Sequence, residues 1–334
     1  MTMQVLGLDI GGANLKAAHS GGTARIEPFR LWRDPGRLTE ELTRLCADMP
    51  PHNLLAVTMT GELCDCFAGK REGVQAILQG VRRASGGIPI RVWTSGGYFL
   101  DIDLAEQDPF RIAAANWLAL AHYIARRFPN EKVLLIDTGS TTTDIVYVNH
   151  GRPEPHGLTD PERLASGELV YTGIRRTPIC AVVGMQVAAE FFATMLDAYL
   201  YVGLLPENPV DYDTADGRPA TCTHARARLA RMRCADAETF SDKQTHEFAQ
   251  LALRTQWRTV EQALDQVVAK KPVIDRLVVS GSGEILGRSV CARHPSFSAL
   301  PLTSLAELVG AELSVAACAY AVAMLAQLEK DHGP

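Results

Sequence analysis

The 334-residue sequence lacks features that would define several classes of protein. Aromatic residues make up only 7%, and 33 lysines and arginines are outnumbered by 38 aspartates and glutamates, for a net charge of −5. Because such a chain has no cationic stripe for a phosphate backbone, we expect no nucleic-acid partner. The most apolar stretch, 181–205, is interrupted by Gln186, Glu190 and Asp197, so we expect no membrane span.

Cysteine usage and the N-terminus favour a reducing compartment. The eight cysteines are irregularly spaced and do not form a disulfide framework. Cys64 and Cys66 could bind a soft metal or form a redox pair, but no second pair stands at zinc spacing, so we expect ordinary reduced thiols. No basic region followed by an apolar stretch opens the sequence, and we expect a cytoplasmic protein.

What the sequence does contain is an alternation of strand-like and helix-like patterns. The first half has apolar runs separated by the glycine pairs 11–12 and 21–22, and the second half is richer in helical periodicity. This pattern predicts an α/β fold in two lobes. The expected strands are 5–9, 15–19, 26–32, 54–59, 88–93, 133–137, 144–148 and 276–280, and the expected helices are 111–127, 186–201, 224–232, 239–269 and 313–328.

One arrangement occurs twice. An apolar strand ends in Asp9, a glycine loop follows, and a second strand begins; the same order recurs at Asp137, with Asp144 opening the later strand. Two copies of strand, aspartate, glycine loop and strand indicate two related halves that face one cleft. No Walker A sequence occurs, so a P-loop site is not expected.

The first loop has the residues that a phosphate site needs. Asp9 supplies a carboxylate for a divalent cation, while Gly11 and Gly12 allow backbone N–H groups to approach an anion. Lys16 follows seven residues after Asp9 and can place a positive charge beside the same anion. A plain hairpin turn with a surface lysine would have the same sequence, and this alternative stays open.

Two further loops have related chemistry. The second contains Gly139 and the hydroxyls of residues 140–143, although a turn stabilised by its own side chains would look similar. The third, 281–283, leads from a strand into a helix and would place a helix N-terminus beside a ligand. Taken alone, its Gly-x-Gly pattern is weak because the dinucleotide spacing is incomplete.

The three loops in this order resemble the superfamily of sugar kinases, actin and heat-shock ATPases. The resemblance implies two ribonuclease H-like lobes that close over a nucleotide and Mg²⁺ in a central cleft. It places the first lobe at 1–110, with the helix 313–334 packed back on it. The second lobe would then be 111–312, with a helical insertion at 186–270.

A narrower resemblance covers nearly the whole chain. It rests on motifs such as LGLDIGGANLKAA (6–18), LLIDTGSTTTDIV (134–146), GELVYTGIRRTPICA (167–181) and VVSGSGEILG (278–287). These resemble the hydantoinase A-related proteins of tetrahydromethanopterin-linked one-carbon metabolism, including synthases of the methanofuran or methylofuran core. The resemblance implies an Mg²⁺-dependent transferase. It would join an aminomethylfuran-methyl diphosphate to the phenol oxygen of a tyrosine- or glutamyl-tyramine-type acceptor and release pyrophosphate.

This resemblance also implies roles for individual residues. Asp9 and Asp137 would hold Mg²⁺, and Asp144 and Glu62 are the candidates for the base that activates the phenol. Whether ATP or ADP is a second ligand stays open, because the condensation itself consumes none. The phosphate-binding set would comprise Gly11, Gly12, Asn14, Lys16, Gly139, Ser140, Thr141, Thr142, Gly281, Ser282 and Gly283, with Lys16 also assisting catalysis.

Two other groups are substrate candidates. Arg175 and Arg176 could pair with a carboxylate of the acceptor, although a surface basic pair is as plausible. Asp213 and Asp216 lie in an irregular stretch, 203–221, that could close on a substrate or simply be solvated.

Two alternatives to the transferase stay open: an ATP-dependent small-molecule kinase of the same fold, and a nucleotide-regulated assembly factor. In each enzymatic case we expect the partners to be small molecules. Whether the chain forms a homo-oligomer stays open.

Overall fold

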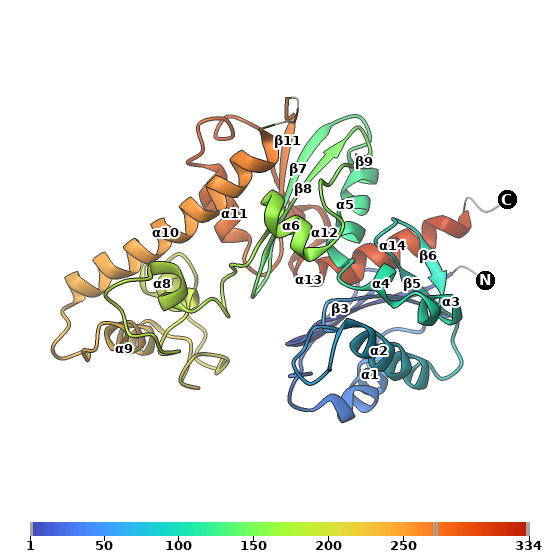
Figure 1. Cartoon of the computed structure of the whole chain (residues 1–334), viewed down its shortest axis with the longest axis horizontal. Coiled ribbons are helices and arrows are strands. Elements are labelled where there is room, and N and C mark those ends of the chain that lie inside the picture. Colours follow the sequence, from blue (N-terminus) through green and yellow to red (C-terminus); the bar gives the residue numbers. More distant parts are fainter. Residues whose placement is uncertain (1–2, 270, 272, 332–334) are drawn as a thin grey trace.

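The computed structural model describes residues 3–269, 271 and 273–331 (Figure 1). The lobes, insertion and closing helix expected from the sequence also include residues 1–2, 270, 272 and 332–334, which lie outside the described part. Two β-sheets form the framework, and helices cover their faces.

The first sheet has the strand order β3-β2-β1-β4-β5-β6. Its central strand β1 pairs antiparallel with β2 and parallel with β4, because β2 returns through a tight turn whereas a helical crossover precedes β4. Every residue of β1 and β4 is buried, as expected for strands covered on both faces. The strands are β1 (Val5–Ile10), β2 (Asn14–His19), β3 (Ala24–Pro28), β4 (Leu54–Met59), β5 (Ile90–Trp93) and β6 (Phe99–Asp101).

The second sheet repeats this plan. Its order is β10-β8-β7-β11-β12, and β9 also pairs with β8. The central strand β7 again has an antiparallel hairpin partner, β8, on one side and a parallel strand, β11, on the other. The repeated topology confirms the two-lobed, ribonuclease H-like α/β fold. The strands are β7 (Lys132–Thr138), β8 (Thr143–Asn149), β9 (Arg152–Pro153), β10 (Leu169–Val170), β11 (Arg276–Ser280) and β12 (Leu302–Ser304).

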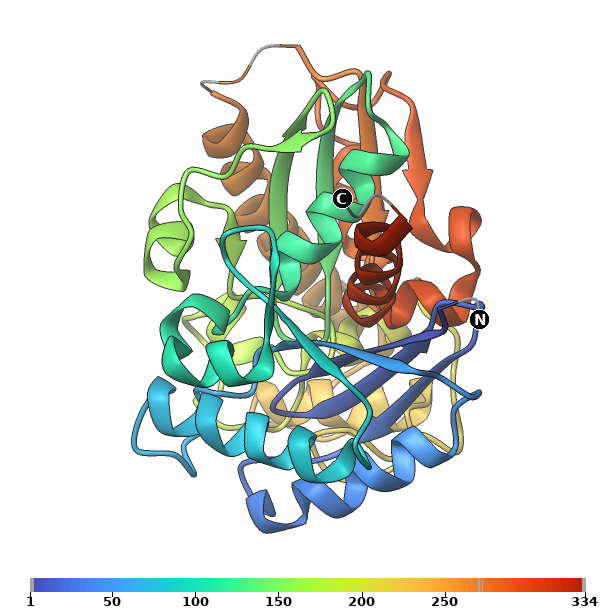
Figure 2. The same cartoon turned by 90° about the vertical axis from the view of Figure 1, so that its right-hand side faces the viewer.

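Two helices lie between the sheets (Figure 2). Helix α14 (Ala317–Asp331) packs on β1, β2 and β4 of the first sheet and on α5 (Asn116–Arg127), which in turn packs on β7 and β8 of the second. Their buried side chains form one core with residues of both sheets, including Val5 and Val133. Helices α1 (Leu38–Ala47) and α2 (Lys70–Ala84) pack on each other in the first lobe. The lobe boundaries expected from the sequence stay predictions.

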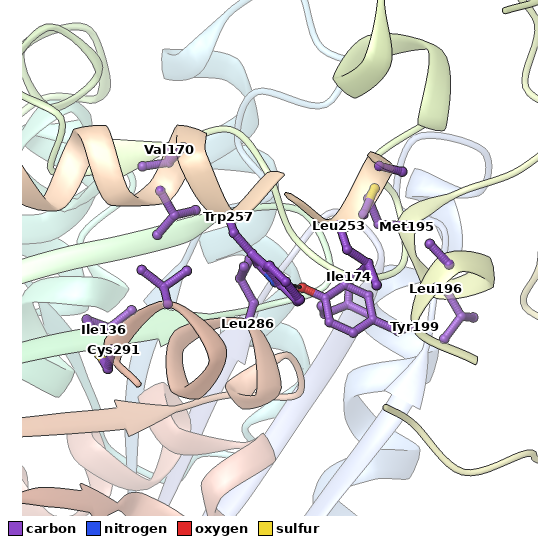
Figure 3. Close-up of a cluster of buried hydrophobic side chains, with 14 of the residues drawn as sticks. Ile136, Val170, Ile174, Met195, Leu196, Tyr199, Leu253, Trp257, Leu286 and Cys291 are labelled. Carbon is purple, nitrogen blue, oxygen red and sulfur yellow. Dashed lines mark hydrogen bonds between the residues drawn. The ribbon is translucent and has the colours of Figure 1, made fainter. Parts of the chain in front are cut away.

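A helical layer covers the other face of the second sheet. The long helix α10 (Asp242–Val268) contacts α8 (Met195–Tyr201), α9 (Cys222–Met232) and α11 (Glu284–Cys291). Figure 3 shows the resulting core, in which Trp257 lies against Tyr199 and the strand residue Ile136 is buried nearby. The indole Nε1 of Trp257 donates a hydrogen bond to the Tyr199 hydroxyl at 3.1 Å.

Several expected elements differ in their bounds. The strand expected at 26–32 ends at Pro28, because the N–H groups of Phe29 and Leu31 bond back to the first glycine loop. The helix expected at 186–201 begins only at Met195, where Thr194 starts it with a capping box. Upstream, the positive φ angles of Gly184 and Gln186 are incompatible with helix.

The remaining differences involve helices that are interrupted. Ala114 has a φ of 49° and separates α4 from α5 within the expected helix 111–127. Ala316, with φ −103° and ψ 29°, divides the expected closing helix into α13 and α14. The shorter helical elements are η1 (Pro35–Arg37), α3 (Ile102–Gln107), α4 (Pro109–Ile112), α6 (Asp160–Ser166), α7 (Ile179–Val183), α12 (Leu305–Val309) and α13 (Ala311–Val315).

None of the helices in the described part of the chain combines the length and apolarity needed to cross a membrane. The eight cysteines are present as free thiols, and Cys46, Cys291 and Cys318 are buried.

Candidate active site

Asp9 and Asp137 lie at equivalent ends of the two central strands and share one electrostatic environment. Asp9 is one residue from the end of β1, and Asp137 is one residue from the end of β7. Burial is the main cause of the raised pKa of Asp137, and the charge of Asp9 makes a minor further contribution, so the two carboxylates lie within electrostatic reach of each other. The structure thus places the two residues on which the predicted site depends at equivalent strand ends of the two lobes.

Lys16 lies beside Asp9 and within electrostatic reach of Asp137. It faces Asp9 across the β1–β2 ladder, and its Nζ lies 3.9 Å from Asp9 Oδ2. Burial opposes the charge on Lys16, yet the carboxylates of Asp9 and Asp137 outweigh this cost and leave the Lys16 pKa above its ordinary value. The raised pKa favours the positively charged form of Lys16, as an anion-binding site requires.

The Asp9 carboxyl is buried and incompletely bonded. Its side chain is only 5% exposed, and Oδ1 has no hydrogen-bond partner among the described residues. Burial raises the pKa of Asp9, although the charge of Lys16 and a hydrogen bond with Asn116 partly offset this. A buried carboxylate oxygen without a partner is costly and indicates a missing cation or donor.

Asp137 has a partner on the neighbouring strand. Ser280, its register partner on β11, donates a hydrogen bond from Oγ to Asp137 Oδ1 at 2.5 Å. Burial raises the pKa of Asp137 to about 6, with further increases from Asp144 and Asp9, while Ser280 and Lys16 lower it. Asp9 has Thr58 in the corresponding position on β4, and the Thr58 hydroxyl is buried without a partner within the described residues.

Asp144 is held by a buried arginine. Arg163 Nη2 lies 2.8 Å from Asp144 Oδ1, and the Arg163 side chain is 1% exposed. The guanidinium also stacks on Trp117, with its carbon 3.8 Å from the ring centroid. Burial raises the pKa of Asp144 even though Arg163 opposes this shift. The predicted base Asp144 thus has one of its oxygens committed to an ion pair.

These residues fit a magnesium ion that is completed by other ligands. Within the described ranges, no three or more His, Cys, Asp or Glu side chains are grouped as metal ligands. Mg²⁺, however, commonly binds through one or two carboxylates together with water and substrate phosphates. Asp9, with its unpartnered oxygen, and Asp137 match that requirement.

The glycine loops contribute fewer free N–H groups than their sequences indicate. The Gly11 N–H donates to Asn14 O at 3.1 Å, and the Gly139 N–H donates to Thr142 O at 2.9 Å. Both amides therefore close their own turns. The amides of Gly12 and Ser140 make no hydrogen bond to the rest of the described chain and are the better anion donors. Thr141 lies in the same turn, where its hydroxyl is 3.3 Å from that of Ser140.

The third loop packs directly on the second. The Gly283 N–H donates to Thr138 O at 2.8 Å, whereas Ser282 between the two glycines is exposed. Gly281 has a φ of 89°, and a Cβ there would meet the Thr138 carbonyl and lie 2.8 Å from Asp137 Oδ1. Only glycine allows this approach. The turn therefore belongs to the same site as Asp137.

Glu62 lies in the segment that follows β4. The preceding Gly61 N–H bonds to Ile10 O at 3.0 Å, which holds this segment beside the first glycine loop. Glu62 is 1% exposed, and its Oε2 has no partner among the residues described. Burial raises the Glu62 pKa to about 7. The charge of Lys70 acts to lower this pKa, and the charge of Asp160 acts to raise it. Such a group exchanges protons near neutral pH.

Arg175 and Arg176 are attached to the second loop through their backbones. Both N–H groups donate to Ser140 O, at 3.0 and 2.9 Å. The Arg176 guanidinium stacks on Trp32 of the first lobe, 4.5 Å from the ring centroid, and therefore links the two lobes. The Arg175 guanidinium pairs instead with Asp211.

The two predicted acidic substrate residues are placed differently. Asp216 pairs with Arg228 and Arg231, at 2.9 and 3.1 Å, and so belongs to an ion-pair network. Asp213 is exposed, and its N–H bonds to Asp211 Oδ1. Among the described residues it is Asp211 that connects this segment to the glycine loops, through Arg175.

Sequence reasoning missed four residues at the site. Ser280 directly precedes the third glycine loop, a position that could have identified it. Asn116, on an apolar helix, and the aromatic Trp32 carry no sequence signal for their contacts with Asp9 and Arg176. Arg163 reaches Asp144 only through the tertiary fold.

Comparison with known sequences places the chain in a family. The Hydantoinase/oxoprolinase family pattern matches residues 53–329, which is most of the sequence. The chain belongs to this family. The match begins after the first glycine loop, so it covers the second and third loops but not Asp9 or Lys16.

Two proteins of curated function are similar to this Hydantoinase/oxoprolinase chain. Both are named (4-{4-[2-(γ-L-glutamylamino)ethyl]phenoxymethyl}furan-2-yl)methanamine synthase. The protein from Methanocaldococcus jannaschii is 30% identical over 342 residues, covering 99% of this chain and 100% of that protein. The protein from Methanococcus vannielii is 27% identical over 210 residues. This similarity covers 60% of this chain and 93% of that protein.

Among solved structures, nucleotide-free acetone carboxylase shares the fold. It is 10% identical, with a TM-score of 0.53, and the similarity covers 96% of this chain and 70% of that one.

Proposed function

We propose that the chain is an Mg²⁺-dependent transferase that forms the aryl ether of a methanofuran-like cofactor, methylofuran. The name of the methanogen synthases supports the proposal, because their product contains a phenol oxygen joined to a furanylmethyl carbon. The similarity to the Methanocaldococcus protein extends over both chains.

The proposed reaction exchanges one C–O bond for another. The phenol oxygen of a tyrosine- or glutamyl-tyramine-type acceptor forms a bond with the methylene carbon of an aminomethylfuran-methyl diphosphate. The bond between that carbon and the diphosphate oxygen breaks, and pyrophosphate leaves with the electron pair. The phenol proton passes to a protein base, so the reaction needs neither ATP nor an oxidant.

The observation that carries the proposal is the ion pair of Lys16 with Asp9 at one strand end, within electrostatic reach of Asp137 at the equivalent strand end of the other lobe. A departing diphosphate accumulates negative charge, and positive groups fixed around it stabilise the transition state. Mg²⁺ bound by Asp9 and Asp137 would supply part of that positive charge. Lys16 and the amides of Gly12 and Ser140 would hold the diphosphate oxygens.

Glu62 fits the role of base better than Asp144. Both were candidates, but Asp144 Oδ1 is bonded to Arg163, whereas Glu62 Oε2 has no partner within the described chain. A phenol has an ordinary pKa near 10 and needs a proton acceptor at neutral pH. With a pKa of about 7, Glu62 is partly ionised there and can take the proton.

One incubation tests the proposal. Purified protein is mixed with Mg²⁺, the furanylmethyl diphosphate and either tyrosine or γ-glutamyltyramine, without ATP. Pyrophosphate and the phenol ether should appear in equal amounts. Obligatory ATP consumption with a phosphorylated product would instead show a kinase, and tight nucleotide binding without turnover would show a regulatory protein. Either of these results would overturn the proposal.

A further inference from the structure

The segment 203–221 between α8 and α9, here called the arm, is a self-contained hairpin. Asn208 and Ala220 form an isolated antiparallel bridge, and the Ala220 N–H also donates to Asp211 O at 2.9 Å. Thr214 Oγ1 bonds to Arg218 O at 2.6 Å. Because these bonds close the arm internally, its conformation does not depend on the side-chain contact that it makes with the glycine loops.

One end of the arm is fixed to the helical layer. Asp216 accepts hydrogen bonds from Arg228 and Arg231. Arg228 is fully buried and also pairs with Asp197, at 2.7 Å, on α8. A buried arginine held by two carboxylates is a rigid attachment. The arm is therefore anchored at Asp216 and reaches the glycine loops five residues earlier, at Asp211.

At that point the arm places a carboxylate on Arg175. Asp211 Oδ2 lies 2.6 Å from Arg175 Nη2, and the Arg175 side chain is 34% exposed. The Arg175 N–H is bonded to Ser140 O, so the backbone of Arg175 is fixed beside the loop that we propose holds the diphosphate. The recorded contact uses one of five guanidinium donors, and a substrate carboxylate could use two in a bidentate pair.

We propose that Arg175 is the binding site for a carboxylate of the acceptor, and that Asp211 occupies this site until the acceptor displaces it. The inference deepens the proposed function, on which it rests for the identity of the acceptor. The pair has a single hydrogen bond, and its arginine is 34% exposed although Asp211 is only 14% exposed, so a bidentate carboxylate can replace Asp211. The acceptor must then carry a carboxylate, whether on tyrosine itself or on a glutamyl group.

Equilibrium binding tests this without turnover. Calorimetry compares tyrosine, γ-glutamyltyramine and tyramine, which has the phenol but no carboxylate, in the presence of Mg²⁺ and pyrophosphate. We expect at least one of the two carboxylate ligands to bind about tenfold more tightly than tyramine. The ligand that does so shows whether the carboxylate belongs to tyrosine or to a glutamyl group. Arg175→Gln should remove this preference, and Arg175→Lys should retain part of it.

The displacement is tested by Asp211→Asn. Because the variant removes the internal competitor, the preferred carboxylate ligand should bind about two- to fivefold more tightly, and tyramine should be unaffected. In an Arg175→Gln background the same change should have no effect. Glu207→Gln, which removes an exposed charge from the same arm, is the matched control and should bind as the wild type does.

Two results would overturn the inference: equal or undetectable binding of all three ligands to the wild type, or unchanged affinity in Asp211→Asn. Thermal melts of each variant exclude a folding defect as the cause. The two proposals fail separately, because binding can depend on Arg175 in a protein that releases no pyrophosphate, and an active transferase can ignore Arg175.

Discussion

Lys16 and Asp144 occupy the same position in the two lobes. Lys16 faces Asp9 across the β1–β2 ladder, and Asp144 faces Asp137 across the β7–β8 ladder. One copy of the shared arrangement therefore contributes a cation, and the other contributes an anion that is paired with Arg163. A nearly symmetric fold thus forms an asymmetric site, in which the lysine is paired with Asp9.

The paired aspartates give the first prediction. Asp9→Asn and Asp137→Asn should each reduce pyrophosphate release at least about a hundredfold, because each removes a carboxylate from the Mg²⁺ site. Asp137→Asn should not lower the melting temperature, since burial already raises the Asp137 pKa and a neutral amide avoids that cost. Asp9→Asn should lower it, because Lys16 loses its ion-pair partner. A stopped assay for pyrophosphate and a thermal melt measure the two effects. Wild-type rates in both variants would falsify the site.

Glu62 gives a prediction about pH. If its ionised form is the base, kcat/KM should fall about tenfold per pH unit below pH 7 and level off above it. Glu62→Gln should abolish this limb and lower the rate about 10²- to 10⁴-fold. An unchanged pH profile in the variant would exclude Glu62 as the base.

The same carboxyl affects stability with a defined sign. Its pKa is raised from 4.5 to about 7, so between these values the folded state binds more protons than the unfolded state, and the free energy of unfolding decreases as pH rises. Glu62→Gln should remove about 3 kcal/mol of this decrease. Denaturant unfolding of the wild type and of Glu62→Gln at pH 4.5 and pH 8 measures this change in the free energy of unfolding. If that free energy decreases equally in both proteins, Glu62 is not the group responsible.

Gln256 gives a prediction about positioning. It is 1% exposed, and its Nε2 donates to Thr172 Oγ1 and Gly173 O, at 2.9 and 2.8 Å. Gly173 touches the second glycine loop so closely that a Cβ there would lie 2.7 Å from Gly139 O. Gln256→Met should therefore raise the KM for the diphosphate about tenfold and cost about 3 kcal/mol of stability.

A neighbouring variant separates the two effects. Tyr199 bonds to the other end of the Gln256 amide, at 3.0 Å, and accepts from Trp257 (Figure 3). Tyr199→Phe leaves the Trp257 N–H unpaired and should cost about 1–3 kcal/mol. Among the described residues the Tyr199 hydroxyl makes no hydrogen bond to residues 172–173, so KM should stay unchanged. Equal KM changes in both variants would show that Gln256 acts only through stability.

The contact between Arg176 and Trp32 predicts that these two residues help to hold the lobes together. A cation–π pair contributes about 0.5–1 kcal/mol at a partly exposed site, so Arg176→Gln and Trp32→Leu should favour opening to the same degree. Small-angle scattering should show a larger radius of gyration for both, and KM should rise about two- to fivefold. A much larger KM effect for Arg176→Gln than for Trp32→Leu would indicate direct substrate binding by Arg176.

Much of this arrangement is visible in the sequence because it depends on local chemistry. Apolar strand periodicity and glycine turns are local signals, so both central strands and the positions of their loops could be predicted. The duplicated order also predicted two similar lobes. Bounds were wrong where a single backbone conformation decided them, as at Ala316 and Gln186.

The amino-acid sequence by itself determined which residue types stand after each strand, and hence that Asp9, Lys16 and Asp137 were candidates for one phosphate site. Only the tertiary structure decided their partners. Arg163 reaches Asp144, Asn116 reaches Asp9 and Asp211 reaches Arg175 through packing of segments distant in sequence. Such contacts leave no periodic pattern in the sequence. They depend on how whole helices and strands pack against one another, and not on residue spacing along one strand or helix.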